Sequence, residues 1–181
     1  MSRHNYRRPL LLVIATGAAL LTGCLRPAPV DTQHYLLPSA TQAVVAPQQV
    51  RVSVAAYLDQ GGLVLAQDHV RIHVAQQHRW GEPLGRQIQR GLSFHLQHYP
   101  DNDALMPIRV DVQGFHGNQQ HQAVIDVGWQ HADGQGQFRW RQPLQQDGYG
   151  ALVLQLDQGL AALACHIRQT SGKHCDRAQK E

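Results

Sequence analysis

Glutamate is nearly absent from this sequence: only Glu82 and the terminal Glu181 occur among its 181 residues. Paired carboxylates for acid–base catalysis would therefore have to be aspartates, which are scattered through expected turns. The sequence also lacks a Gly-x-Ser-x-Gly nucleophile motif, a His-Glu-x-x-His zinc motif and a glycine-rich phosphate-binding loop. These absences predict a protein that has no catalytic residues and no bound cofactor, and that is not an enzyme.

Lysine is also scarce, since only Lys173 and Lys180 are present. Three of the 16 basic residues lie within residues 1–23, which contain no acid. The rest of the chain carries equal numbers of basic and acidic residues. A neutral body with so few lysines makes a poor phosphate-binding surface, so nucleic acid is not an expected partner.

Histidine, in contrast, is abundant, with 12 residues. His69 and His73 share one face of an expected strand, and His95 and His98 share one face of an expected helix. Neither pair has an obvious carboxylate or cysteine to complete a zinc site. Because the histidines alternate with apolar positions, most are expected to face water, and no metal site is predicted.

Residues 1–23 have the plan of a secretory signal peptide. A basic start precedes the apolar run from Leu10 to Leu21, which is shorter than the roughly 20 residues that a membrane-spanning helix needs. The run ends in Leu21-Thr22-Gly23-Cys24, which resembles the bacterial lipobox. The resemblance implies signal cleavage between Gly23 and Cys24. An ordinary signal peptide with a chance cysteine is the alternative.

The lipobox resemblance also implies a covalent lipid anchor. The Cys24 sulfur would carry a diacylglycerol, and its new amino group would gain a further fatty acyl chain such as palmitate. Leu25 stands where an aspartate commonly retains lipoproteins at the inner membrane, so the expected location is the periplasmic face of a Gram-negative outer membrane. Residues 24–33 contain two prolines and no apolar periodicity, which predicts a flexible tether.

Two cysteines remain, Cys165 in an expected helix and Cys175 in the C-terminal tail. In an oxidising periplasm they are expected to pair or to stay as spectators. A Ser-Gly turn between them offers a path for the tail to return to the helix, which makes the pair a candidate disulfide. A metal site with the adjoining His166 and His174 is the weaker alternative.

Apolar and polar residues alternate along several segments, as in half-buried strands. A short strand is expected at 34–37, and further strands are expected at 50–54, 63–65, 70–74, 108–112, 125–129 and 138–140. In segment 70–74, Val70, Ile72 and Val74 are the expected inward-facing residues.

Two other stretches have helical spacing. Leu84, Ile88, Leu92 and Leu96 form one apolar face, opposite Arg86, Gln87 and Arg90, and Pro83 fits the first turn. The second apolar face contains Leu152, Leu156, Leu160, Leu163 and Ile167, with Asp147 placed to cap the helix start. Two amphipathic helices among roughly six strands predict an α/β fold with a mixed sheet.

Several segments, in order, resemble the ABC-type transport auxiliary lipoproteins. After the lipobox they are Tyr35-Leu36-Leu37-Pro38, Val54, Tyr57, Leu58, Gly62–Leu65, His78–Leu84, Phe115, Gly117, Val124–Trp129 and Asp147-Gly148-Tyr149. The most distinctive is Trp80-Gly81-Glu82-Pro83-Leu84, although members usually carry alanine in place of Gly81. The resemblance covers about residues 34–170, which defines the expected domain, and the tail 171–181 lies outside it.

This resemblance implies the three-layer α/β fold of the anticodon-binding and TolB amino-terminal domains. It also implies an accessory role in lipid transport and membrane integrity. The implied partners are an ABC transporter and a membrane-anchored MCE protein that forms a hydrophobic conduit. Some members are thought to assemble as homo-oligomeric rings at the outer membrane. An envelope assembly or secretion adaptor without a role in lipid transport is the alternative, followed by an enzyme with a histidine-built site.

Within that family, Tyr57, Trp80, Glu82 and Pro83 are candidate partner or subunit contacts, because aromatic side chains dominate interface energies. The alternative interpretation is structural. In it, Trp80 fills the core, and Glu82 with Pro83 starts the following helix with a favourable charge near its N-terminus.

Overall fold

A computed structural model describes residues 31–44, 49–98, 107–170, 172 and 175. The predicted signal peptide, its cleavage site at Gly23 and the lipidation site at Cys24 lie outside the described residues. Most of the tether and of the tail also lie outside them. The described elements all belong to the unit from Thr32 onward.

Seven strands, two α-helices and one short 3-10 helix are present in the described residues. In chain order they are β1 Gln33–Tyr35, η1 Pro38–Thr41, β2 Val50–Val54, β3 Gly62–Ala66, β4 Ile72–Trp80, α2 Leu84–Gln97, β5 Ile108–Asn118, β6 Gln122–His131, β7 Gly134–Pro143 and α3 Tyr149–Thr170. The predicted mixed α/β fold with two main helices is confirmed.

The strands form one mixed sheet with the order β1-β4-β3-β5-β6-β7, and β2 pairs with β5 outside this path. β1 with β4, β2 with β5 and β3 with β5 are parallel, whereas the other pairs are antiparallel. β2 pairs with the first half of β5, from Ile108, and β3 pairs with its end, at Gly117 and Asn118. The long strand β5 therefore joins two parts of the sheet.

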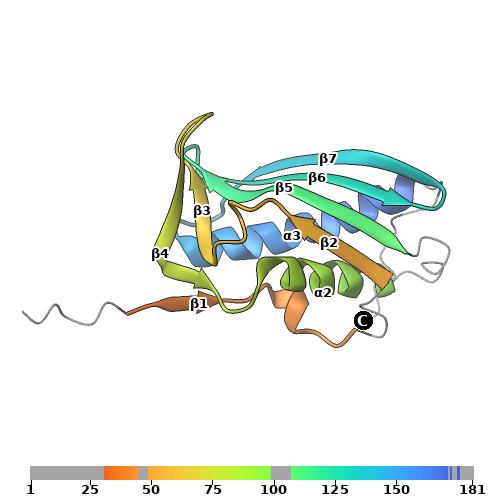
Figure 1. The fold of residues 1–181 in the computed structure, drawn as a ribbon, viewed down its shortest axis with the longest axis horizontal. Helices are drawn as coiled ribbons and strands as arrows, with labels where there is room; N and C mark the ends of the chain where they lie inside the picture. Colours follow the sequence, from red (N-terminus) through yellow and green to blue (C-terminus); the bar gives the residue numbers. More distant parts are fainter. Residues whose placement is uncertain (1–30, 45–48, 99–106, 171, 173–174, 176–181) are drawn as a thin grey trace, which may run out of the picture. The chain divides into compact units, whose positions relative to one another are not determined.

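The two helices pack against the sheet and against each other (Figure 1). α2 contacts β2, and α3 contacts β5, β6 and β7. The apolar faces predicted for both helices are buried: Leu84, Ile88, Leu92, Leu96, Leu152, Leu156, Leu160, Leu163 and Ile167 are each at most 2% exposed. Full burial of such a side chain stabilises the fold by about 1.5–3 kcal/mol.

Helix α3 is, among the described helices, the one that is long and apolar enough to cross a membrane. Its apolar face is buried in the protein core, to which Leu156, Leu160 and Leu163 belong. A helix with this packing is a core helix of the domain.

One strand begins later than predicted. Val70 was expected to face inward but is 88% exposed, and Ile72, where β4 starts, is 43% exposed. The cause is Asp68, whose Oδ1 accepts hydrogen bonds from the backbone N–H groups of Val70 and Arg71, at 2.9 and 2.7 Å. An aspartate that bonds its own following backbone favours a turn. The prediction of an inward-facing strand over Val70 and Ile72 was therefore wrong.

Candidate functional site

Trp80 lies in the protein core. It ends β4, is 7% exposed, and its indole ring is 6.2 Å from the ring of Phe115. Its backbone N–H donates to Gly61 at 2.8 Å, and the N–H of Gly81 donates to Tyr35 at the same distance. These contacts join β1, β3 and β4 around the indole. They favour the structural interpretation of Trp80 over a partner contact.

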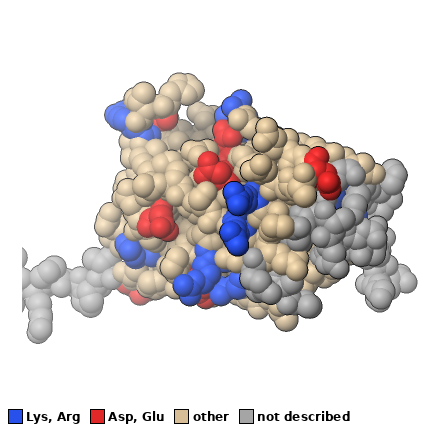
Figure 2. Space-filling model, turned by 45° about the vertical axis from the view of Figure 1, so that its right-hand side comes forward, with Lys and Arg blue, Asp and Glu red and all other residues tan. Residues whose placement is uncertain are grey.

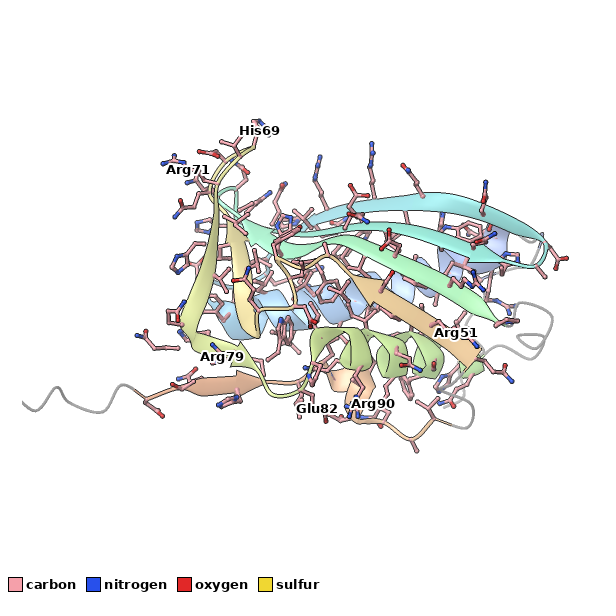
Figure 3. All side chains as sticks on the ribbon, in the orientation of Figure 1. Arg51, His69, Arg71, Arg79, Glu82 and Arg90 are labelled. Carbon is pink, nitrogen blue, oxygen red and sulfur yellow. A yellow bond between two sulfur atoms is a disulfide. The ribbon has the colours of Figure 1, made fainter. Side chains whose placement is uncertain are left out.

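Glu82 and Pro83 form the start of helix α2. Pro83 is exposed at the N-cap position, and α2 follows from Leu84. Glu82, two residues before α2, forms an ion pair with Arg90 of that helix, with Oε2 to Nη2 at 2.8 Å, and Figure 3 shows the two side chains side by side. The hydrogen bond from Arg90 lowers the pKa of the Glu82 carboxyl. Glu82 thus has an ion pair within its own segment, and Pro83 has a position at the helix start.

Tyr57 holds the turn after β2 against strand β5. Its hydroxyl donates to the backbone oxygen of Gln113 at 2.6 Å, and its ring is half-buried. Burial, with a smaller effect of Asp126, raises the pKa of the Tyr57 hydroxyl. A role of Tyr57, Glu82 or Pro83 in partner contact stays a prediction.

Gln87 was expected on the solvent face of helix α2, but it is completely buried. Its Oε1 accepts the backbone N–H of Leu37 at 2.9 Å, and its Nε2 donates to the backbone oxygen of Glu82 at 3.0 Å. One amide therefore connects the Tyr35–Pro38 segment to the Trp80–Leu84 segment. Helical spacing gave no sign of this role, because it depends on a partner 50 residues away.

Cys165 and Cys175 form a disulfide bond, with their Cα atoms 5.3 Å apart. The bond attaches the tail to helix α3. In the described part of the chain, no group of three or more His, Cys, Asp or Glu residues could hold a metal ion. The cysteines are thus joined to each other in this structure.

A cavity of about 630 Å³ lies where strand β3 meets the end of β5 and the start of helix α3. This hairpin cavity is lined by Leu65, Ala66, Gln67, His73, Asn118, Gln119, His121, Leu144, Asp147, Gly148, Tyr149 and Leu152. Its rim is held by the contact between His121 Nδ1 and Asp147 Oδ1 at 3.0 Å. Asp147, expected to cap α3, thus contacts the β5–β6 turn. The leucines offer contacts for an apolar group, and the polar residues of the rim offer hydrogen bonds that would orient it.

A second hollow lies on the outer face of the sheet, opposite the helices. This sheet groove has a volume of about 700 Å³ and is lined by Arg51, Val52, Ser53, Arg109, Val110, Asp111, Gly128, Trp129, Gln130, Gln135, Gly136 and Gln137. Gly128 leaves space there, since a Cβ at this position would have no atom within 4 Å. On the face seen in Figure 2, acidic and basic residues are interspersed without a large area of one sign. The arginine, aspartate, serine and glutamine side chains in the lining of the groove suit a polar protein contact.

Acid is expected to destabilise the domain through His116. This half-buried histidine lies on β5, and burial, with a smaller effect of Arg141, lowers its pKa below the usual 6.5. Below pH 6.5 the unfolded chain binds this proton more readily than the folded protein, so stability present at neutral pH is lost as pH falls. When the pH is lowered from about 7.5 to 5.5, we expect the free energy of unfolding to fall less in His116→Gln than in the protein with His116. Urea unfolding at each pH measures this quantity.

The exposed His73 provides the control for this measurement, because His73→Gln should keep the full pH dependence. Equal pH dependence of the His116→Gln variant and the unmodified protein would contradict the assignment to His116.

The domain is similar to known proteins in sequence and in fold. The sequence model of the family described as "ABC-type transport auxiliary lipoprotein component" matches residues 35–168. The crystal structure of a protein described as uncharacterized has a TM-score of 0.64 and 25% sequence identity, covering 78% of this chain and 99% of that one. A Xanthomonas campestris protein of the family labelled DUF330 has a TM-score of 0.50 and 11% identity, covering 81% and 92%, which shows the fold alone. No curated protein matches the chain.

Proposed function

This chain belongs to the family of ABC-type transport auxiliary lipoprotein components, and from that premise we propose that it is a non-catalytic docking subunit of an intermembrane lipid transport system. The family supports an accessory role beside an ABC transporter and a location in the cell envelope. The proposed finer role is contact with an MCE-family conduit protein at the periplasmic face of the outer membrane. The family match over residues 35–168 is the observation that carries the proposal.

The proposed attachment to the membrane is a lipid on Cys24. Leu21-Thr22-Gly23-Cys24 precedes the matched domain at the distance of a short tether. Each buried methylene contributes about 0.8 kcal/mol, so one acyl chain holds a protein only weakly and two or three hold it stably. A diacylglycerol with a further acyl chain on one residue would therefore keep the domain at the membrane.

A docking role agrees with the surfaces of the domain. In the described residues no group of three or more His, Cys, Asp or Glu side chains could hold a metal ion. The sheet groove and the hairpin cavity instead leave open areas on which another protein or a lipid can bind. Interfaces of accessory subunits need exposed and complementary surface rather than a reactive residue.

Cys24→Ser is expected to release the protein from membranes. Without the thiol no diacylglycerol can be attached, so the membrane-bound fraction should fall by at least about tenfold, given that acyl chains supply the binding energy. Flotation of cell membranes, with mass spectrometry of the mature N-terminus, measures this. Cys175→Ser is a matched control that removes a different cysteine. A Cys24→Ser variant that still floats would contradict the lipid anchor.

Partner capture tests the transport role separately. The lipidated protein should co-purify with an MCE-family protein from membranes that also contain the ABC transporter. Binding to cell-wall assembly or secretion components, with no MCE protein recovered, would favour the adaptor alternative. A substrate turned over by the purified protein would overturn the non-catalytic role.

A further inference from the structure

The connection between β3 and β4 exposes two aliphatic side chains at its end. We define the hairpin end as residues 67–72, which contain Val70, 88% exposed, and Ile72, 43% exposed. In Figure 1 this end extends upward at the left of the view, away from both helices. The largest aliphatic exposure of the described chain is therefore at the tip of a projecting hairpin. Transfer of these two side chains from water into an apolar environment is favourable.

The charges of the hairpin end neutralise each other. Arg71 Nε lies 2.7 Å from Asp68 Oδ2, and the backbone N–H of Val70 is the main cause of a lowered pKa at Asp68. Figure 3 shows His69 and Arg71 together at this end. Aliphatic side chains beside arginine and histidine are typical of a membrane interface, where polar heads stay in the headgroup layer. A lipid surface thus fits the chemistry of the tip.

The tether enters the described domain at strand β1. β1 runs parallel to β4, and Gln33 is paired with His78, six residues after the start of β4 at Ile72. The six residue steps from Ile72 to His78 span about 20 Å. The nine residue steps from Cys24 to Gln33 span at most about 30 Å. The tether is therefore long enough for an anchor on Cys24 and the hairpin end to reach the same membrane.

We infer that the hairpin end contacts the phospholipid leaflet that holds the lipid anchor, with Val70 and Ile72 inserted at the interface. The inference rests on the proposed lipidation of Cys24. Two aliphatic side chains contribute too little to bind the membrane alone, so the acyl chains hold the protein and the hairpin sets its orientation. With the hairpin end as well as the anchor at the membrane, the sheet groove can take a narrower range of orientations relative to the bilayer.

A fluorophore at position 70 tests the contact. In the full-length lipidated protein, Cys24 is acylated and Cys165 is bonded to Cys175, so Val70→Cys introduces one free thiol. It is labelled with an environment-sensitive dye, and the protein is reconstituted in vesicles of phosphatidylethanolamine and phosphatidylglycerol that contain a lipid-attached quencher. Leu154→Cys, at a leucine of helix α3 that is 57% exposed, is the matched control. Thermal unfolding checks that both labelled proteins are folded.

We expect the dye at position 70 to be quenched at least about threefold more than the dye at position 154, because only the first lies at lipid depth. Ile72→Asp in the Val70→Cys protein should reduce this quenching at least about twofold, since a charge opposes insertion. Equal quenching at positions 70 and 154, in protein that floats with the vesicles, would overturn the inference and leave the lipid anchor intact.

Two further outcomes are also decisive. A dye at position 70 that becomes shielded only after the MCE protein is added would overturn the lipid contact and assign the hairpin end to a protein interface. A lipidation-competent protein that does not float at all would contradict the anchor itself, and the inference would fall with it.

Discussion

Trp80→Ala is expected to lower the free energy of unfolding by about 3–5 kcal/mol, the usual cost of replacing a buried tryptophan by alanine. The indole of Trp80 is 7% exposed and packs near Phe115, so its removal leaves a cavity between β4 and β5. The melting temperature should fall by about 10 °C, since 1 kcal/mol corresponds to about 2–4 °C in a domain of this size. Urea unfolding followed by circular dichroism measures both quantities.

Trp80→Phe is the matched control, because an aromatic ring fills part of the same space and should recover much of the lost stability. One result would favour the interpretation of Trp80 as a partner contact. That result is a Trp80→Ala protein with an unchanged melting temperature that no longer captures its partner.

The helices and strands were predictable where the spacing of apolar residues along the sequence matched the side of the element that is buried. The leucines and isoleucine of helix α2, from Leu84 to Leu96, are buried as their spacing predicted. Ile125, Val127 and Trp129 on β6 are buried as their alternation predicted. Alternation failed at Val70, because one Asp68 carboxylate satisfies two backbone N–H groups and bends the chain. A local hydrogen bond there outweighs the burial of a single valine.

The arrangement of the sheet was not predictable in the same way. β2 and β3 both pair with β5, although β4, α2 and the loops lie between them in sequence. Neither of the two hollows can be read from local pattern, because the hairpin cavity combines residues from Leu65 to Leu152. Contacts between distant segments depend on how all elements pack together, and one sequence gives little information on that.

The segments that carry the family resemblance meet in one structural junction. Tyr35 and Trp80 are paired across β1 and β4, Trp80 bonds to Gly61, and Gly81 bonds to Tyr35. At Gly62 a Cβ would lie 2.3 Å from the backbone oxygen of Ala75, so the close approach of β3 and β4 requires glycine. These segments specify the fold. Val70, at the proposed membrane contact, and Arg51, in the sheet groove, lie outside this junction.

Gln87→Met is expected to lower the free energy of unfolding by about 2–4 kcal/mol, because it leaves one buried and one part-buried backbone group without their amide partner. Methionine has a similar volume, so it separates the loss of hydrogen bonds from the creation of a cavity. The unpaired groups would be the N–H of Leu37 and the carbonyl of Glu82. Urea unfolding measures the loss.

Arg86→Met, at the exposed neighbouring position, is the control and should change the free energy of unfolding by less than about 0.5 kcal/mol. Hydrogen exchange at the Leu37 N–H gives a second readout, since this proton should exchange much faster in Gln87→Met. If Gln87→Met is as stable as Arg86→Met, the amide does not hold the junction. The Tyr35–Pro38 segment would then be fixed by its other contacts, such as the pairing of β1 with β4 and the hydrogen bond from Gly81 to Tyr35.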